Sequence, residues 1–402
     1  MNRSLIQHTA TLLAFAVLLT LASCGSNTSE HASGHANGYA NGYTCPLETY
    51  NETHNNESAY PPYDTNEATN NANDEANIPT ETTSNDATTN DAPTEPEPEC
   101  QIWLAEFAAP YFARLQAIWD KDNGQMWGTP LHIPVIIFCT DTDVIAASSP
   151  GRIAMQAHDI DGIAVYTATM RINMPGIGRM SWQRQQLGVF IQLQFMQTAM
   201  LPGVYDSSLV SLMHINHYAF HALQPSLMGV DGAYPPAGAN NETGRISIML
   251  EINALIYAIH ASGEAKFAAA FDALSIRHGR RYAFPSAMTE NLQQVSEGTA
   301  VYTDHHMVFT REEIDTIITS WPAHFMYMDD ALSVAISYGY YGGALYGMLL
   351  DDFGVDWRPH VGRDTDLGLM LQEALGITYF IPLDEVDLER YGYTAITERV
   401  RQ

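Results

Sequence analysis

Three histidines in one short apolar stretch are the residues of this chain best suited to carry chemistry. His214, His217 and His221 lie three and then four residues apart within SLMHINHYAFHALQ, residues 211–224, so on an α-helix they share one face. The other positions are mostly apolar, which is typical of a buried helix, and buried imidazoles need partners. Two histidines one turn apart can grip a single metal ion, so the stretch predicts a metal site.

Several segments resemble one known family. HYAFH (217–221) resembles the HExxH zinc helix of gluzincin metallopeptidases, with Tyr218 in place of the glutamate, and EGTAVY (297–302) is similar to the EGxAxY helix that supplies their third ligand. More narrowly, the chain resembles a bacterial family of gluzincin-like lipoproteins and secreted proteins. The matching segments, in the order of that family, are WDKDNGQMWG (119–128), FHALQ (220–224), GRISIMLEINAL (244–255), EGTAVYTD (297–304) and YYGGALYGMLLDDFG (340–354).

The resemblance implies a zinc ion held by His217, His221 and Glu297. Glu251, in MLEINAL, is an alternative carboxylate ligand, or a partner that orients an imidazole N–H. His214 is a candidate fourth ligand, which would close the site and favour a structural zinc. The competing interpretation is that these are core histidines, hydrogen-bonded to backbone or to the same acids without a metal.

Tyr218 decides which chemistry such a site could perform. In HExxH enzymes the glutamate takes a proton from metal-bound water and later gives it to the leaving amine. Tyrosine, with a pKa near ~10, is mostly protonated at neutral pH and is a poor base. Tyr340 matches a family tyrosine whose hydroxyl stabilises the oxyanion in gluzincins, and helix packing is the alternative role for its glycine-rich segment. A further acid of the family pattern is replaced by Val301.

The N-terminal quarter of the chain predicts a secreted, lipid-anchored protein. Residues 1–24 read as a bacterial lipoprotein signal peptide, with Arg3, an apolar run from Leu12 to Leu21, and small residues before Cys24, the expected lipidation site. Residues 25–99 are acidic and poor in bulky aliphatic residues, which predicts a disordered tether. We therefore expect an extracytoplasmic protein held at the bacterial cell membrane through Cys24.

Charge and cysteine content exclude two classes of site. The net charge is −28, and Lys121 and Lys266 are the only lysines, whereas nucleic-acid binding needs a basic surface. No CxxC motif is present, which excludes a zinc site made of cysteines. One disulfide, Cys100–Cys139 or Cys45–Cys100, is a possible pairing, and free buried thiols are the alternative.

Residues 100–402 are expected to form one α+β domain: a small antiparallel sheet followed by a mainly helical, zincin-like part. A first helix is expected at 101–120, split or kinked at Pro110. Strands are expected at 131–139, 142–147, 152–157, 162–168 and 190–195. Helices are expected at 206–224, 244–262, 264–282, 286–304, 311–319, 330–353 and 366–375, ended by residues such as Pro225 and Gly354.

Together these features predict a cell-surface lipoprotein whose metallopeptidase-like domain has lost hydrolytic power and acts in binding or scaffolding. The expected ligand is a peptide or protein, and by resemblance the sheet beside the zinc helix is either a shelf for that ligand or mere scaffold. Two alternatives remain open: an active zinc hydrolase that uses another base, such as Glu251 or Asp304, and a metal-free binding lipoprotein.

Overall fold

The computed structural model describes residues 99–172, 176–183, 186–198, 206–230, 241–328 and 331–402. The described residues from Cys100 onward belong to one compact unit. The predicted signal peptide, the lipidation site at Cys24 and the predicted tether up to residue 98 lie outside the described residues.

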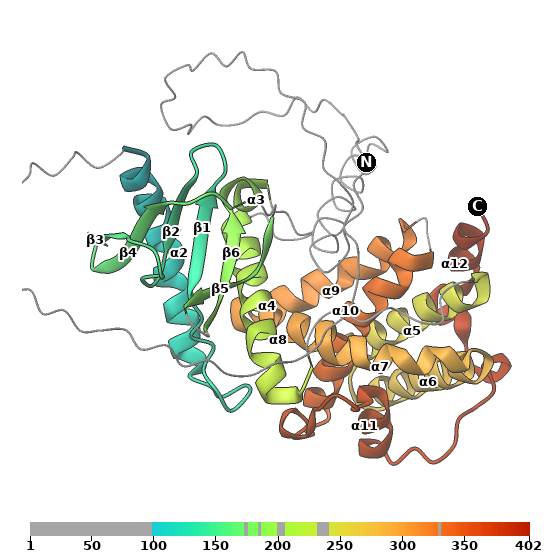
Figure 1. The fold of residues 1–402 in the computed structure, drawn as a ribbon. Coiled ribbons are helices and arrows are strands. Elements are labelled where there is room, and N and C mark those ends of the chain that lie inside the picture. Colours follow the sequence, from blue (N-terminus) through green and yellow to red (C-terminus); the bar gives the residue numbers. More distant parts are fainter. Residues whose placement is uncertain (1–98, 173–175, 184–185, 199–205, 231–240, 329–330) are drawn as a thin grey trace, which may run out of the picture. The chain divides into compact units, whose positions relative to one another are not determined.

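One long helix, a sheet and then a series of helices follow one another along the chain, which confirms the expected α+β class (Figure 1). The elements up to the end of the sheet are α2 (Glu99–Asp122), β1 (Val135–Cys139), β2 (Val144–Ala147), β3 (Gln156–Ile160), β4 (Ile163–Thr169), β5 (Ile177–Gln183) and β6 (Gln186–Gln192). The helices after the sheet are α3 (Leu193–Thr198), α4 (Ser207–Met228), α5 (Glu242–His260), α6 (Gly263–Ala283), α7 (Glu290–Gln293), α8 (Thr299–Val308), α9 (Arg311–Met326), α10 (Ala331–Asp352), α11 (Leu367–Ala374) and α12 (Tyr393–Val400).

The six described strands form one mixed sheet in the order β3-β4-β2-β1-β6-β5. Four neighbouring pairs are antiparallel, but β1 and β6 are parallel, with Val135 opposite Val189. The expectation of an antiparallel sheet is therefore wrong at this pair. The chain leaves β1, builds β2 to β5, and returns in the direction of β1, a long-range pairing that local sequence patterns do not encode.

Alternation along the strands gives the sheet two apolar faces. Val135, Ile137 and Val189 belong to the main core, which includes the helices, whereas Ile136 and Phe190 belong to a second, smaller apolar cluster. This is the period of two expected for strands with both faces covered. The main core therefore continues from the sheet into the helical part.

α4, the helix of the three histidines, contacts both parts of the fold. It packs against β5 and β6 on one side and against α8 on the other, and Figure 1 shows it between the sheet and the remaining helices. Asp206 caps its N-terminus by accepting from the amide of Ser208, and Gly229 ends it with φ 67°. A helix covered on two sides must be apolar nearly all round, as its sequence is.

Three sequence expectations about prolines and element ends need correction. α2 is not split at Pro110, and α4 continues through Pro225 to Met228. The expected strand at 190–195 ends at Gln192, where α3 begins, and the C-terminal α12 was not expected. A proline in a helix removes one hydrogen bond, and tertiary packing can offset that loss.

The structure tests one of the two expected disulfides. Cys139 is a free, buried thiol, so the expected Cys100–Cys139 disulfide is wrong. Cys100 is disulfide-bonded.

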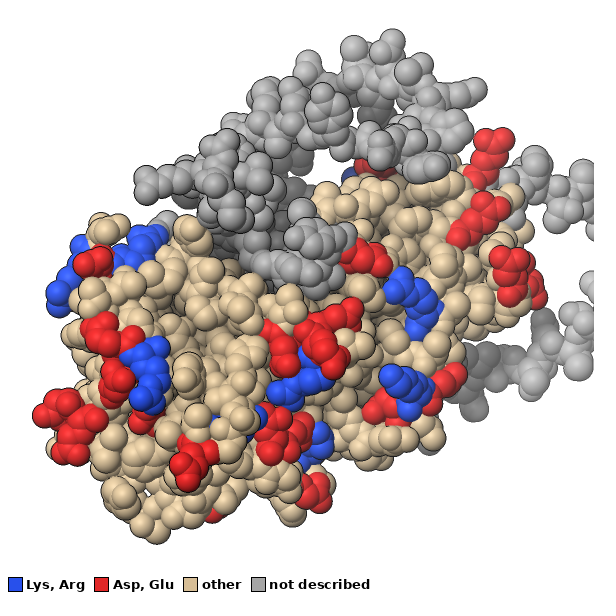
Figure 2. Space-filling view, turned by 180° about the vertical axis from the view of Figure 1, so that it is seen from behind, with Lys and Arg blue, Asp and Glu red and all other residues tan. Residues whose placement is uncertain are grey.

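Among the described residues, no helix combines the length and the apolar character needed to cross a membrane. On the face shown in Figure 2, Lys and Arg side chains are scattered among Asp and Glu rather than gathered into a basic patch.

A partly buried neutral histidine, His324, predicts a fold that loses stability in acid. Burial lowers the pKa of His324 to about 4, whereas the unfolded chain binds the proton near ~6.5. The stability that this neutral imidazole contributes is complete above the unfolded pKa and is lost as pH falls toward 4. The wild type should therefore lose more free energy of unfolding between pH 7 and pH 5 than His324→Phe does. We expect this difference to be about 1–2 kcal/mol, measured by urea denaturation with a chelator present.

The exposed residue His360 offers the matched control, His360→Phe. An identical pH dependence in wild type and His324→Phe would contradict the assignment of this acid sensitivity to the ring of His324.

Candidate metal centre

Three ligand atoms from two segments of the chain meet at one buried point. Nε2 of His221 lies 3.0 Å from Nε2 of His217 and 3.1 Å from Oε2 of Glu297, and Nε2 of His217 lies 3.5 Å from that oxygen. The three residues are 7%, 8% and 1% exposed, in that order. In the described part of the chain they are the one group of His, Cys, Asp and Glu side chains placed to hold a metal ion.

The other nitrogen of each ring is held by a hydrogen-bond acceptor. Nδ1 of His217 lies 2.9 Å from Oδ2 of Asp304, and Nδ1 of His221 lies 2.6 Å from Oε1 of Gln224. The Gln224 amide is oriented by its Nε2, which donates to the carbonyl of Ser296 at 2.6 Å, so its oxygen faces the ring. Both Nδ1 atoms therefore carry the proton, and in the neutral rings both Nε2 atoms present lone pairs to each other and to Glu297.

This arrangement requires positive charge at the meeting point. Burial alone would raise the pKa of Glu297, but the two imidazoles hold it well below its usual range. Burial alone would lower the pKa of His217, yet hydrogen bonds and charges from Asp304 and Glu297 raise it to about 9. At neutral pH the site must hold either an extra proton on the imidazoles or a cation between the three ligand atoms.

The three ligand atoms fit a tetrahedral metal ion. Bonds of about 2.0–2.1 Å to nitrogen and oxygen place the corners of a tetrahedron roughly 3.3 Å apart, and the observed separations are 3.0, 3.1 and 3.5 Å. Two imidazoles and one carboxylate are a ligand set of zinc, and each imidazole has the hydrogen-bonded outer partner that bound metal sites normally show. A metal ion can therefore be accommodated with little movement of the ligands.

α4 supplies both imidazoles, and a proline near its end helps to fix one of them. His217 and His221 are one turn apart, so their rings lie on one face of the helix. Pro225 has no N–H to donate to the carbonyl of His221, four residues before it. Nη1 of Arg179, on the edge strand β5, donates to that carbonyl at 3.0 Å instead. Pro225 thus leaves the carbonyl of His221 without a donor in the helix, and through this carbonyl the sheet holds the backbone of His221.

Glu297 is delivered by a π-helical turn, Gln294–Gly298, between α7 and α8. Such turns are rare and occur mostly as single insertions at functional sites. The turn lies tightly against α10, since a Cβ atom at Gly298 would lie 2.5 Å from Cα of Gly343. Only glycine permits this approach, which explains one of the glycines in the YYGGALYG segment.

The other candidates of the sequence analysis lie around this group or away from it. The ring of Tyr218 lies edge-on to both imidazoles, with centroids 5.5 Å from His217 and 5.9 Å from His221. The ring of Tyr340 stacks parallel to that of His217 at 6.0 Å. His214 instead donates from Nδ1 to the carbonyl of Val210 at 2.8 Å and packs against Phe195. It is not part of the group.

Glu251 is also placed elsewhere. Its Oε1 accepts from the hydroxyls of Tyr338 and Tyr346 at 2.6 and 2.7 Å, and its Oε2 accepts from Nη2 of Arg280 at 2.8 Å. The structure therefore brings Glu297, and not Glu251, to the histidines. Glu251 is fully occupied in a buried ionic network.

Sequence reasoning missed the two outer partners in these roles. Gln224 follows His221 by three residues, so helical spacing could have placed it beside that ring. Asp304 follows Glu297 by seven residues, two turns along a helix, but the sequence alone suggests it only as a possible base. Its oxygens are engaged by His217 and by Nδ1 of His305, and its pKa lies below the usual range because these imidazoles outweigh the effect of burial.

Comparisons with known proteins leave the site to be interpreted from its own geometry. No protein-family model matches the chain, and neither does any curated protein or solved structure.

The outer partners give a test of the site that does not depend on activity. Asp304→Asn keeps the shape of the side chain but removes the charge that fixes the tautomer and raises the basicity of His217. Loss of such a partner typically weakens metal binding about 10–100-fold, and we expect a loss of this size in a competitive Zn2+ titration. Asp272→Asn is the matched control, because Asp272 is a buried acid that accepts from Tyr391 at 2.6 Å and is absent from the metal group. Equal affinities in both variants would contradict the role of Asp304.

Proposed function

We propose that this chain is a metal-binding surface protein with a gluzincin-like domain that holds zinc and has lost peptidase activity. The observation that supports it most is the convergence of two imidazole lone pairs on one carboxylate at tetrahedral spacing. His217, His221 and Glu297 would be the ligands, and zinc is the metal whose peptidase sites use this His-His-Glu set.

Loss of hydrolysis follows from the residue between the two histidines. A zinc peptidase needs a base beside the metal-bound water, and the position that supplies it holds Tyr218; a phenol, with an ordinary pKa near ~10, is a poor base. General acid–base assistance is worth about 10²–10⁴-fold in rate. The residues that would hold the metal are present, whereas the residue that would transfer the proton is not.

An active hydrolase with another base has little support from the described residues. Both oxygens of Asp304 are engaged by imidazoles, one of them at the Nδ1 side of a proposed ligand. Glu251 is locked by Arg280 and two tyrosines. Neither carboxylate is free to take a proton from a water molecule at the meeting point of the ligands.

A binding role suits the position of the site beside a sheet edge. β6, which contains the first half of the strand expected at 190–195, has β1 and β5 on its two sides, so it cannot accept a further strand. β5 is an edge strand, and it contacts α4. A peptide or protein segment that adds to β5 would use backbone hydrogen bonds for affinity. With the lipid anchor on Cys24, we propose that the domain presents this edge outside the bacterial cell membrane and has no nucleic-acid partner.

Metal content is the direct test of the proposal. We expect about one zinc ion per purified chain by elemental analysis, retained in His214→Ala and lost in His217→Ala. His214 is the control because it lies on the same helix but outside the ligand group. Absence of zinc from the wild type, together with no binding on titration, would favour the metal-free alternative, in which a proton balances the buried charges.

Peptidase activity is the second test. We expect the zinc-loaded wild type to cleave no peptide of a diverse fluorogenic library, and Tyr218→Glu to gain cleavage that a chelator abolishes, because the substitution restores the base at its usual position. Wild-type cleavage that disappears in His217→Ala would show instead that the enzyme is active with another base.

A further inference from the structure

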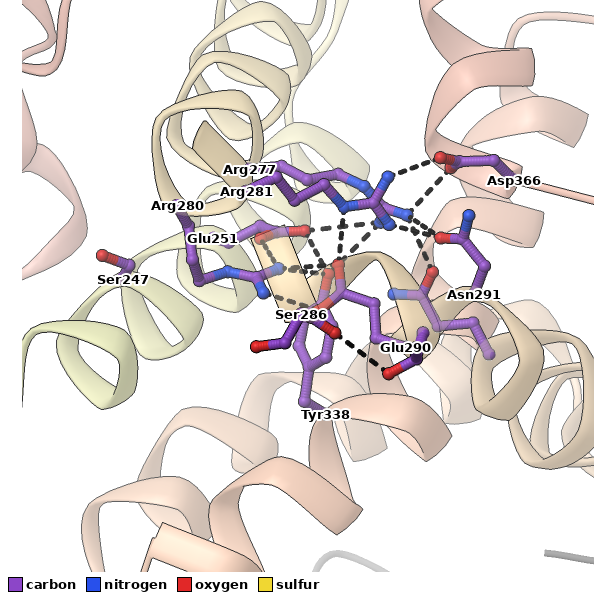
Figure 3. A network of polar contacts seen from close by, with 12 residues as sticks. Ser247, Glu251, Arg277, Arg280, Arg281, Ser286, Glu290, Asn291, Tyr338 and Asp366 are labelled. Carbon is purple, nitrogen blue, oxygen red and sulfur yellow. Dashed lines mark hydrogen bonds and ion pairs between the residues drawn. The ribbon is translucent and has the colours of Figure 1, made fainter. Parts of the chain in front are cut away.

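A buried ionic network borders the turn that carries Glu297 (Figure 3). Its cations are Arg277, Arg280 and Arg281, one after another on the inner face of α6, and Figure 3 shows them pointing into the space between α5, α7, α10 and the start of α11. Its anions are Glu251, Glu290 and Asp366. Three positive and three negative groups balance, so no cation of the network remains for an outside anion.

One half of the network anchors α7. Arg280 makes two contacts with Glu290, at 2.6 and 3.1 Å, and a third with Glu251 at 2.8 Å. Arg281 donates from Nε to Glu290 at 2.8 Å. These are bidentate and charge-assisted bonds in a dry environment, which are the strong and geometrically specific kind.

The other half reaches the π-helical turn itself. Nη2 of Arg277 donates to Oε1 of Gln294 at 3.0 Å, to Oδ1 of Asn291 at 2.9 Å and to Oδ1 of Asp366 at 2.9 Å. Gln294 is the first residue of the turn, and it is fully buried. The guanidinium thus ties the start of the turn to α6 and to the N-cap residue of α11.

The turn is held at three places, and the network supplies one of them. Gly298 fixes its end against α10, and Gln224 fixes its middle through the carbonyl of Ser296 while also orienting the ring of His221. A π-helical turn contains one residue more than an α-helical turn in the same length. Relaxation to α-helix would rotate the following residues about 100° around the axis, which would carry the Glu297 carboxylate away from the imidazoles.

We propose that Arg277, acting through Gln294, is a positioning residue for the metal centre: it holds the π-helical turn in the form that places Glu297 on His217 and His221. This inference rests on the proposed metal-binding function. It assigns the network a role beyond stabilising the packing of α5, α6 and α10.

The sharpest variant cuts the bond to the turn and leaves the ion pairs intact. Gln294→Met removes the acceptor while keeping a side chain of similar length, and Arg277 retains its contact with Asp366. Gln101→Met is the matched control, because Gln101 is a buried glutamine on α2 that accepts from Thr167 at 3.0 Å, with no link to the metal ligands.

Affinity for Zn2+ and the visible absorption of bound Co2+ are measured on the full chain. We expect Gln294→Met to bind Zn2+ about 10-fold more weakly, at the lower end of the range for outer partners of metal ligands, and to change the Co2+ spectrum because one ligand is displaced. Gln101→Met should lower the melting temperature without changing either. Should Gln294→Met fail to fold, Arg277→Lys keeps the charge but loses the forked geometry and is expected to weaken binding likewise.

The outcomes separate this inference from the proposed function. A wild type that binds no Zn2+ refutes the proposed function and the inference with it. A wild type that binds, with Gln294→Met unchanged in affinity and Co2+ spectrum, overturns the inference alone.

Discussion

The structure depends on how one concentration of buried charge is balanced. Two imidazole lone pairs and a carboxylate face each other within hydrogen-bond distance, in residues that are less than a tenth exposed. An uncompensated charge in such a place costs several kcal/mol, so the fold must supply either protons or a cation there. Asp304 and Gln224 fix the tautomer of the rings by accepting hydrogen bonds from the two Nδ1–H groups. They leave both Nε2 atoms facing the carboxylate, an arrangement that could hold a metal ion.

The architecture around the site explains why its helices are apolar on nearly every side. α4 contacts both the sheet and α8, so little of its surface faces solvent. Its imidazoles therefore form a polar site inside the core. The carboxylate comes from a turn that is π-helical and pressed against α10 through Gly298 and Gly343. The close approach of two glycines and the π-helical turn are both locally unfavourable features, and they occur in the same place. Such features are common at functional sites.

Local spacing accounts for the part of the site that the sequence predicts. His217 and His221 must share a helix face, and most helices were expected within a few residues of their observed positions. Three other features join different segments of the chain. They are the parallel pairing of β1 with β6, the hydrogen bond from Arg179 to the carbonyl of His221, and the hydrogen bond from Arg277 to Gln294. No periodic pattern encodes such pairs, since each depends on tertiary packing that overrides local preference.

The uneven state of the site argues for a binding role. Its holding parts are complete: two imidazoles, an acid, and an outer acceptor for each ring. The part that would move protons is a phenol at position 218, and the carboxylates of Asp304 and Glu251 are committed to imidazoles and to an arginine. Removing one member of such a group would leave a buried charge without a partner, which costs about 3–5 kcal/mol, so the three side chains depend on one another. Their coexistence with Tyr218 is what a domain would show if metal binding still serves its structure or its ligand while hydrolysis does not.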